Sequence, residues 1–205
     1  YNDHKNLTLK SLNYLKKIIK NDLDSYGFPK SRNISLLIFF LKYLILIREW
    51  FKESQNEIPE FINENIFYLG QSYAFFWQNI NSDLLFNGNN KSNNSNFDLY
   101  LKRLGYTFKN DNNEIGNYVI LKNKKKVIVM DVGPSPNKKF SGDYQAGALS
   151  FEFISNGEKV LTNPGYYSKK NIKLNELSKL SASHNVLTVD DNSSCFWLSL
   201  IFVCC

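Results

Sequence analysis

The stretch DYQAGALSFEFISNGEKVLTNPGYYSKKNIKLNELSKLSASHNVLTVDD, residues 143–191, decides how the rest of the chain is interpreted. Apolar side chains alternate from Ala148 to Ile154, which predicts a half-buried strand. Ser155-Asn156-Gly157 follows with an Asn-Gly pair, a favoured composition for a tight hairpin turn, and Glu158 to Thr162 predicts the return strand. The stretch therefore predicts an antiparallel hairpin with polar side chains at its strand ends.

Two further features of this stretch mark where strand pairing stops and resumes. Asn163-Pro164-Gly165 interrupts the ladder, because proline lacks an amide donor and glycine permits a positive φ. The run from Val186 to Val189 predicts a further strand. The segment between these two strands carries polar side chains at the strand ends, where a functional site would require them.

Three motifs of the stretch, GALSFEF, LTNPGYY and SASHNVLTVDD, occur in the order found in the β-domain of the heparinase II/III family. The chain thus resembles these polysaccharide lyases, in which an α/α-toroid is joined to an antiparallel β-sandwich. The family usually has a His-x-His-x-x-Ala-Leu-Ser-Phe run where this chain has Asp143 and Gln145 in place of the histidines. The positions that match the ligands of zinc-binding members are Gln145, Asn163 and His184. Because neutral amide oxygens are weak ligands for zinc, we expect no cofactor and no zinc site.

The first part of the chain carries apolar residues at helical spacing. The pattern predicts amphipathic helices over residues 8–19 and 36–51, and a third that begins near Pro59 and continues to Phe76. Lys42 interrupts the second apolar run, which is therefore shorter than the roughly 20 residues that a membrane span requires. We expect buried helices of a multi-helix domain and no transmembrane span.

Loops separate the predicted helices. Residues 22–33, DLDSYGFPKSRN, contain glycine, proline and several capping residues, and residues 79–96 are rich in Asn, Ser and Gly. A short helix from Phe97 to Leu104 is closed by Gly105 at the expected C-terminal position. The resemblance extends here, since the first loop is similar to a toroid loop and FFWQNINSDLLFNGNN is similar to a run that ends in Phe-Asn-Gly in some bacterial members.

A change from helical to strand periodicity sets the domain organisation. Short β-rich runs at 118–121 and 127–130, joined by an Asn-Lys turn, follow the last predicted helix. Helices first and strands second indicate an α+β protein in two parts. By the resemblance, we expect residues 1–105 to form the closing helices of an α/α-toroid and residues 106–194 to form the start of the β-sandwich.

The last eleven residues, CFWLSLIFVCC, are uncharged and apolar, with no period and no signal for a partner strand. A family member would continue with several more alternating strands, so we expect the chain to be truncated or frame-shifted after about Ser194, with 195–205 a non-native tail. The tail is too short to span a membrane, and such a segment promotes aggregation when it is exposed.

The net charge of +6 and pI near 9.1 favour an acidic partner, although the lysines are dispersed among asparagines and aromatic residues. A solvated basic surface and an anion-binding surface both remain open. The only dense run is 122–126, where a hairpin turn is expected, and no nucleic-acid-binding signature accompanies it. We therefore expect no nucleic acid partner, and the three cysteines give no disulfide framework.

The resemblance implies β-elimination on a uronate-containing acidic polysaccharide. Removal of the proton beside a carboxylate builds negative charge, so an enzyme needs neutralising donors, a base, and an acid for the leaving oxygen. Arg32 and Asn33 in the toroid-like loop are candidate carboxylate binders, and Tyr26 or Tyr144 is the candidate phenol. Asp143 stands at the position of a catalytic histidine, where a carboxylate would repel a uronate. This cleft requires Arg32 and Tyr144 to face the same side of the domain junction.

Three other residues are candidate substrate contacts: Gln145, Lys179 and His184. A histidine bonded to neighbouring backbone is the competing interpretation of His184, and a structural ion pair is that of Arg32. Two functions stay open, namely a polysaccharide lyase and a catalytically degenerate glycan-binding or structural protein. The resemblance implies the cell envelope or periplasm, and the oligomeric state is unknown.

Overall fold

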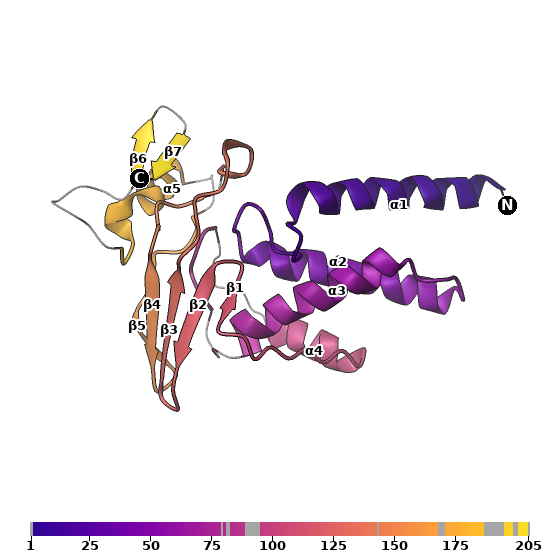
Figure 1. Ribbon diagram of the computed structural model, residues 1–205, viewed down its shortest axis with the longest axis horizontal. Coiled ribbons are helices and arrows are strands. Elements are labelled where there is room, and N and C mark those ends of the chain that lie inside the picture. Colours follow the sequence, from indigo (N-terminus) through magenta and orange to yellow (C-terminus); the bar gives the residue numbers. More distant parts are fainter. Residues whose placement is uncertain are drawn as a thin grey trace.

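The computed structural model describes residues 2–78, 80, 83–88, 95–142, 144–167, 171–186, 195–198 and 201–204. The first four helices occupy one end of the molecule, and an antiparallel sheet and the fifth helix occupy the other (Figure 1), which confirms the predicted α+β class. The described α-helices are α1 Asn2–Asp22, α2 Ser35–Glu53, α3 Glu60–Tyr73, α4 Ser95–Arg103 and α5 Ile172–Lys179. No helix of the described residues is long and apolar enough to span a bilayer.

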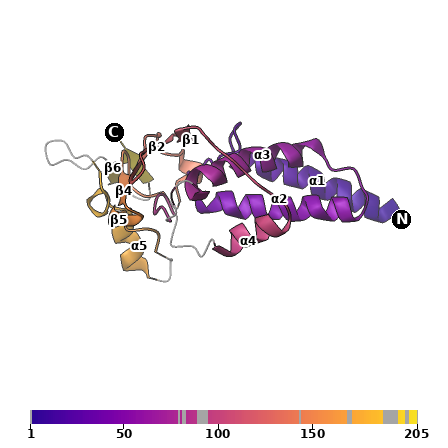
Figure 2. The same cartoon turned by 90° about the horizontal axis from the view of Figure 1, so that it is seen from below.

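The three long helices follow the predicted periodicity. In α2 the buried side chains Leu37, Phe40, Leu41, Leu44 and Ile45 recur at spacings of three and four, so one stripe of the helix faces the core. Helix α3 begins directly after Pro59 and runs into a π-helical turn, Ala74–Gln78. In both views α2 and α3 lie side by side (Figures 1 and 2).

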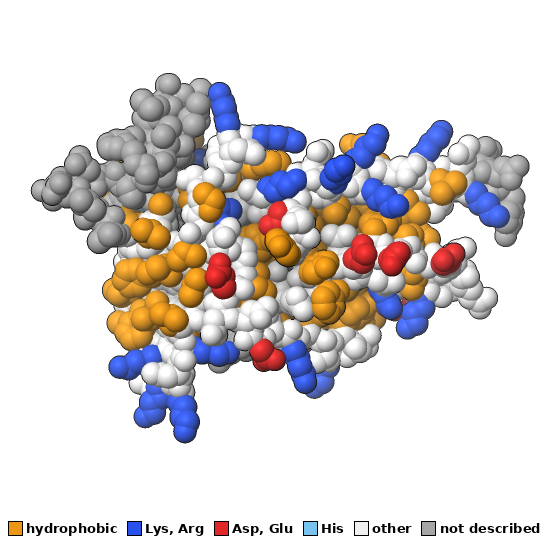
Figure 3. Space-filling view, in the orientation of Figure 1, with side chains coloured by type: hydrophobic (Ala, Val, Ile, Leu, Met, Phe, Trp, Pro, Cys, Tyr) orange, Lys and Arg blue, Asp and Glu red, His pale blue; other side chains and the backbone are white. Residues whose placement is uncertain are grey.

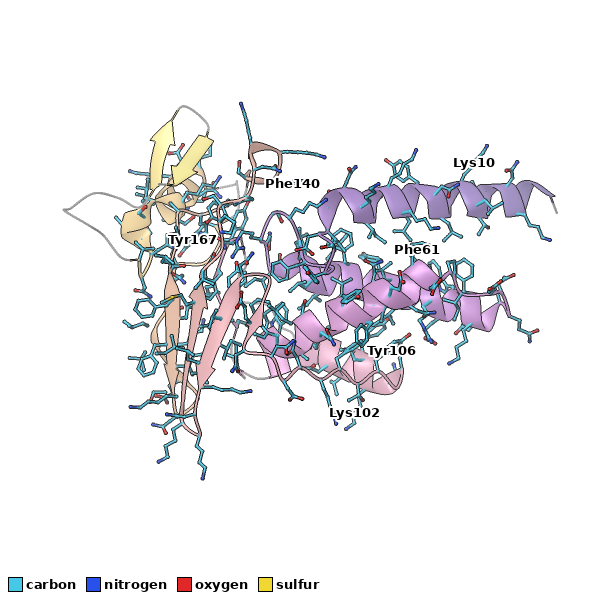
Figure 4. The ribbon with its side chains drawn as sticks, in the orientation of Figure 1. Lys10, Phe61, Lys102, Tyr106, Phe140 and Tyr167 are labelled. Carbon is cyan, nitrogen blue, oxygen red and sulfur yellow. The ribbon has the colours of Figure 1, made fainter. Side chains whose placement is uncertain are left out.

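Helix α1 lies along the other helices and turns its charged side outward. Phe61 of α3 points toward α1 (Figure 4), and the Lys16 amine of α1 lies 4.8 Å from the centre of its ring. Lys10 extends on the opposite side of α1. The predicted amphipathic helix is thus confirmed, with bounds wider than residues 8–19.

The sheet has the order β1-β2-β3-β4-β5, and every neighbouring pair is antiparallel. Side chains alternate across it, so Ile120, Val129 and Ile154 face the helices and are buried, whereas Leu121 on the other face is exposed. The strands are β1 Glu114–Ile115, β2 Tyr118–Lys122, β3 Lys126–Asp131, β4 Phe151–Ser155 and β5 Glu158–Leu161.

Aromatic side chains connect the helical end to the sheet. The ring of Tyr118 on β2 lies 5.9 Å from that of Phe28 in the 22–33 loop and 5.2 Å from that of Phe76 in the π-helical turn. These residues belong to one hydrophobic cluster with both the helices and the sheet. The division near residue 105 stays a prediction, and the cluster crosses it.

The structure corrects two predictions about strands. Strand β4 begins at Phe151 and not at Ala148, because Ala148 and Leu149 form a turn in which Leu149 has φ +58°. The apolar tail was predicted to lack a partner strand, but β6 Cys195–Leu198 and β7 Ile201–Cys204 pair antiparallel with each other. Aromatic and β-branched residues favour strands, and a chain folded back on itself satisfies its own backbone groups.

Two further segments, residues 172–179 and 186–189, differ from the prediction made from the sequence. Helix α5 was not predicted, although the Asn171 side chain accepts a hydrogen bond from the Leu174 amide and so caps its first turn. Of the strand predicted over 186–189, only Val186 lies in the described part of the chain, where it has no regular structure. The rest of that prediction lies outside the described residues.

Candidate functional site

The 22–33 loop is built around Asp24. One carboxylate oxygen of Asp24 accepts hydrogen bonds from the amides of Tyr26 and Phe28, both at 2.8 Å. Gly27 between them has φ +72°, a conformation that glycine adopts without strain. The loop is therefore closed locally and holds Arg32 between the helical end and the sheet.

Arg32 is buried and links three segments of the chain. Its guanidinium forms an ion pair with Asp131 at the end of β3 and donates to the Gly116 carbonyl at 3.2 Å. It lies over the Tyr118 ring, 4.8 Å from the ring centre, and only 5% of the residue is exposed. A side chain at Gly133 would overlap the guanidinium, so the chain needs glycine there. The geometry agrees with a structural ion pair for Arg32.

Asp131 is the centre of a closed polar network. Besides Arg32, it accepts hydrogen bonds from the Asn87 amide at 2.6 Å and from the Gly133 backbone amide at 3.1 Å. Asn87 also donates to the Tyr118 hydroxyl, which donates to the Arg32 carbonyl. Burial raises the pKa of Asp131, and the adjacent guanidinium opposes that change. The sequence analysis missed Asp131, whose signal is a carboxylate that ends an otherwise apolar strand.

Tyr144 lies close to this ion pair and is itself buried. Burial raises the pKa of Tyr144 to about 12, with Asp131 acting in the same direction, while Ser135 and Arg32 oppose the change. Within the described residues, Arg32 Nε has no hydrogen-bond partner despite its burial, and the Tyr144 and Ser135 hydroxyls lie close together without a well-formed hydrogen bond. The Arg32 and Tyr144 side chains are near enough for their charges to interact, and Tyr144 is not among the residues that line the hollow beside Arg32.

A hollow of about 220 Å³ opens beside Arg32. Its wall includes Lys30, Arg32, Asn117, Ser135 and Asn137, from the 22–33 loop, the β1–β2 turn and the segment after β3. The Lys30 amine donates to the carbonyls of Lys20 and Asn21 at the C-terminal end of α1. Two cations and the Asp24 carboxylate therefore border the hollow, and Asp131 compensates the charge of Arg32.

Other predicted catalytic residues are placed differently. Tyr26 is 75% exposed and lines a second, larger hollow. Asn33 accepts hydrogen bonds from the Ser35 amide and hydroxyl, so its side-chain oxygen is engaged in a local turn just before α2. Asp143 lies outside the described residues. The Lys179 amine donates to the Gly142 carbonyl at 3.0 Å.

The three positions that match family metal ligands lie close together. The Gln145 amide and His184 Nε2 both point at the Ser178 carbonyl oxygen, at 3.0 and 2.9 Å, and His184 Nδ1 is 3.3 Å from Asn163 Oδ1. Burial lowers the pKa of His184 to about 4, against the hydrogen bond to Ser178. The amide nitrogen of Gln145 also donates to Gly165. These residues form a hydrogen-bonded cluster, and this donor set does not fit zinc.

No group of three or more His, Cys, Asp or Glu side chains in the described parts of the chain is arranged to hold a metal ion. Glu152, which is fully buried on β4, is instead used for structure. It accepts hydrogen bonds from the Leu85 and Asn163 backbone amides at 2.9 and 3.2 Å and pairs with Lys159. Glu152 therefore ties the loop before α4 to the turn after β5.

Comparisons with known proteins show what part of the chain is similar to. Residues 112–201 match the sequence model described as heparinase II/III-like, C-terminal. No curated protein matches the chain. Among solved structures, heparinase III is similar at 16% identity and TM-score 0.65, with 86% of this chain and 34% of that one covered. Heparan sulfate lyase HepC from Pedobacter heparinus is similar at 14% identity and TM-score 0.67, with 88% and 32% covered. The chain thus spans about a third of these proteins, and the likeness shows the fold.

Proposed function

Residues 112–201 match the heparinase II/III-like, C-terminal family model, and on this premise we propose that the protein binds a uronate-containing polysaccharide beside Arg32 and cleaves it by β-elimination. One observation carries the proposal. The 220 Å³ hollow is bordered by Lys30 and Arg32, the Ser135 hydroxyl belongs to its wall, and the buried Tyr144 lies near Arg32. Cations and free hydroxyl groups are what an acidic sugar residue requires of its site.

The proposal includes the architecture implied by the family. Residues 1–105 close an α/α-toroid, and residues 106–194 open a β-sandwich. The outer face of the sheet supports this, since the cross-strand row Leu121, Ile128 and Phe153 is apolar and at least partly exposed. A second sheet is the usual cover for such a face. The site then lies at the junction of the two domains.

The roles in elimination follow from protonation. With a pKa of about 12, the Tyr144 phenol is protonated at neutral pH, so it acts as the acid that protonates the leaving glycosidic oxygen. A base takes the proton beside the uronate carboxyl, the carbon–oxygen bond breaks and a double bond forms. Asp143 is the base in this scheme, and the Lys30 ammonium neutralises the carboxylate. Arg32 contributes less, because Asp131 already compensates its charge.

The Arg32–Asp131 ion pair also favours a second candidate, a glycan-binding envelope protein without catalysis. A guanidinium held by a buried carboxylate has little charge left to stabilise the negative charge that develops in elimination. In both candidates the partner is an acidic polysaccharide and the protein works in the cell envelope or periplasm. The two differ only in whether the bond is broken.

An activity screen separates the two candidates. The purified protein is incubated with heparan, chondroitin and alginate, and the ultraviolet absorbance of unsaturated uronate products is followed. Tyr144→Phe keeps the ring and removes only a hydroxyl without a well-formed hydrogen bond, so it should fold normally and lower the rate by about 100-fold. Tyr26→Phe is the matched control on an exposed tyrosine and should retain the rate. Silence on every substrate with glycan binding retained would favour the second candidate, and a fully active Tyr144→Phe variant would refute the role of Tyr144.

A further inference from the structure

A second hollow opens on the other side of the contact between Phe28 and Gly116. The Phe28 ring packs on the Gly116 backbone, where any side chain would press into the ring. The second hollow has a volume of about 490 Å³, with walls from residues 24–28 of the loop, 68–72 of α3 and 112–117 around β1. Asp24, Phe28, Gly116 and Asn117 line both hollows, so the two share a rim.

Two exposed aromatic rings stand in the wall of this second hollow. Tyr26 is 75% exposed and Tyr68 is 40% exposed. Gly27 brings them near each other, because its Cα lies so close to Tyr68 Cβ that a side chain at 27 would be 2.9 Å from that atom. An exposed tyrosine offers a flat apolar face together with a hydroxyl, which suits the C–H face and hydroxyl groups of a sugar ring.

This wall differs in charge from that of the first hollow, because Glu114 belongs to the second hollow alone, Lys30 and Arg32 belong to the first alone, and Asp24 lines both. Asp24 and Glu114 contribute carboxylates, and none of the described residues that line it is a lysine or an arginine. Figure 3 shows acidic side chains between the sheet and the helices, while many lysines and arginines lie along α1 and at the lower tip of the sheet. A sulfate or uronate group would meet two carboxylates here, which disfavours its binding. Neutral hydroxyl groups would find amide and carboxylate partners on Gln71, Asn112 and Glu114.

We propose that this second hollow binds an uncharged pyranose residue, with its ring against Tyr26 and Tyr68 and its hydroxyl groups hydrogen-bonded to the polar wall. The carboxylates of Asp24 and Glu114 exclude sulfated and uronate residues from it. This site goes beyond the proposed function and does not depend on it, because it holds even where the hollow beside Arg32 binds nothing. The shared rim also allows one glycan to place an acidic residue in the first hollow and a neutral residue in the second.

Isothermal titration calorimetry with matched probes tests this site. The purified protein is titrated with a neutral tetrasaccharide of N-acetylglucosamine and with its 6-O-sulfated derivative. The neutral probe should bind saturably, and the sulfated one about tenfold more weakly or not at all. Tyr26→Ala should weaken the neutral probe about tenfold, a loss of roughly 1.4 kcal/mol, whereas Tyr26→Phe should stay within about threefold of the wild type. Tyr14→Ala, on the exposed Tyr14 of α1, is the matched control and should bind like the wild type.

A further variant tests the charge argument. Glu114→Lys removes one carboxylate and adds a cation, so it should raise the affinity for the sulfated probe while binding of the neutral probe persists. The proposal is refuted by no saturation with the neutral probe, by equal affinity for the two probes in the wild type, or by a Tyr26→Ala variant that binds like Tyr14→Ala. None of these binding measurements depends on lyase activity. A negative result would therefore refute the neutral-sugar site and leave the proposed acidic-sugar site beside Arg32 untouched.

Discussion

Asp131→Asn is the substitution with the largest predicted cost, because it leaves the Arg32 guanidinium buried without a counter-charge. The Asp131 side chain is fully buried and that of Arg32 is 7% exposed, so water cannot compensate. Removing one partner of a buried ion pair costs about 3–5 kcal/mol of unfolding free energy. The substitution also weakens the hydrogen bonds that Asn87 and the Gly133 amide donate to residue 131. We therefore expect the loss of unfolding free energy to lie in the upper part of that range.

Urea unfolding at pH 7, followed by far-ultraviolet circular dichroism, measures this cost. The double variant Arg32→Met with Asp131→Leu replaces the pair by apolar side chains and should recover to within about 1 kcal/mol of the wild type. Lys52→Met is the control, because the Lys52 side chain that pairs with Glu49 is 66% exposed, and it should cost less than about 1 kcal/mol. A loss below about 1 kcal/mol for Asp131→Asn, or a double variant as unstable as the single one, would refute the role assigned to the pair.

Three other predictions follow from the same contacts. Gly133→Ala should cost about 1–3 kcal/mol in urea unfolding, because the added methyl group overlaps the buried Arg32 guanidinium. Gly142→Ala is the control, since no atom lies within 4 Å of its added methyl group, and it should change stability by less than about 0.5 kcal/mol. Equal effects of the two substitutions would contradict the overlap. The pKa of His184 is lowered in the folded state to about 4, so protonation opposes folding: stability is complete above about pH 6.5 and falls toward pH 4, by at most about 3 kcal/mol. His184→Gln should flatten the dependence of the unfolding free energy on pH between about pH 6.5 and pH 4. An unchanged dependence would show that His184 is not its cause. Gln145→His combined with Asn163→Asp should create a site that retains one zinc ion per chain by metal analysis after dialysis, and failure to retain zinc would show that the three positions are not arranged as ligands.

Much of the fold was predictable because local patterns decided it. Helices α2 and α3 have a 3.6-residue apolar repeat, and the β4–β5 hairpin has Asn156-Gly157 at its turn with φ +52° and +83°. Strand β4 began late because Leu149 adopts a positive φ, which a leucine in an alternating run does not signal. The pairing of β6 with β7 was missed, since an unbroken apolar run carries no period.

The candidate site was less predictable, because it depends on contacts between distant parts of the chain. Arg32 and Asp131 are 99 residues apart, and no local pattern pairs them. Tyr26 and Arg32 share a loop, yet the tight turn around Asp24 directs them to different hollows.

The central claim is that the hollow beside Arg32 binds an acidic sugar residue through its charge. The most direct measurement is calorimetric titration of the protein with a uronate-containing tetrasaccharide and with the same tetrasaccharide after reduction of its carboxyl groups. The acidic form should bind about tenfold more tightly, and Lys30→Ala should remove most of that difference. Equal affinity for the two forms, or a preference that Lys30→Ala leaves intact, would contradict the claim.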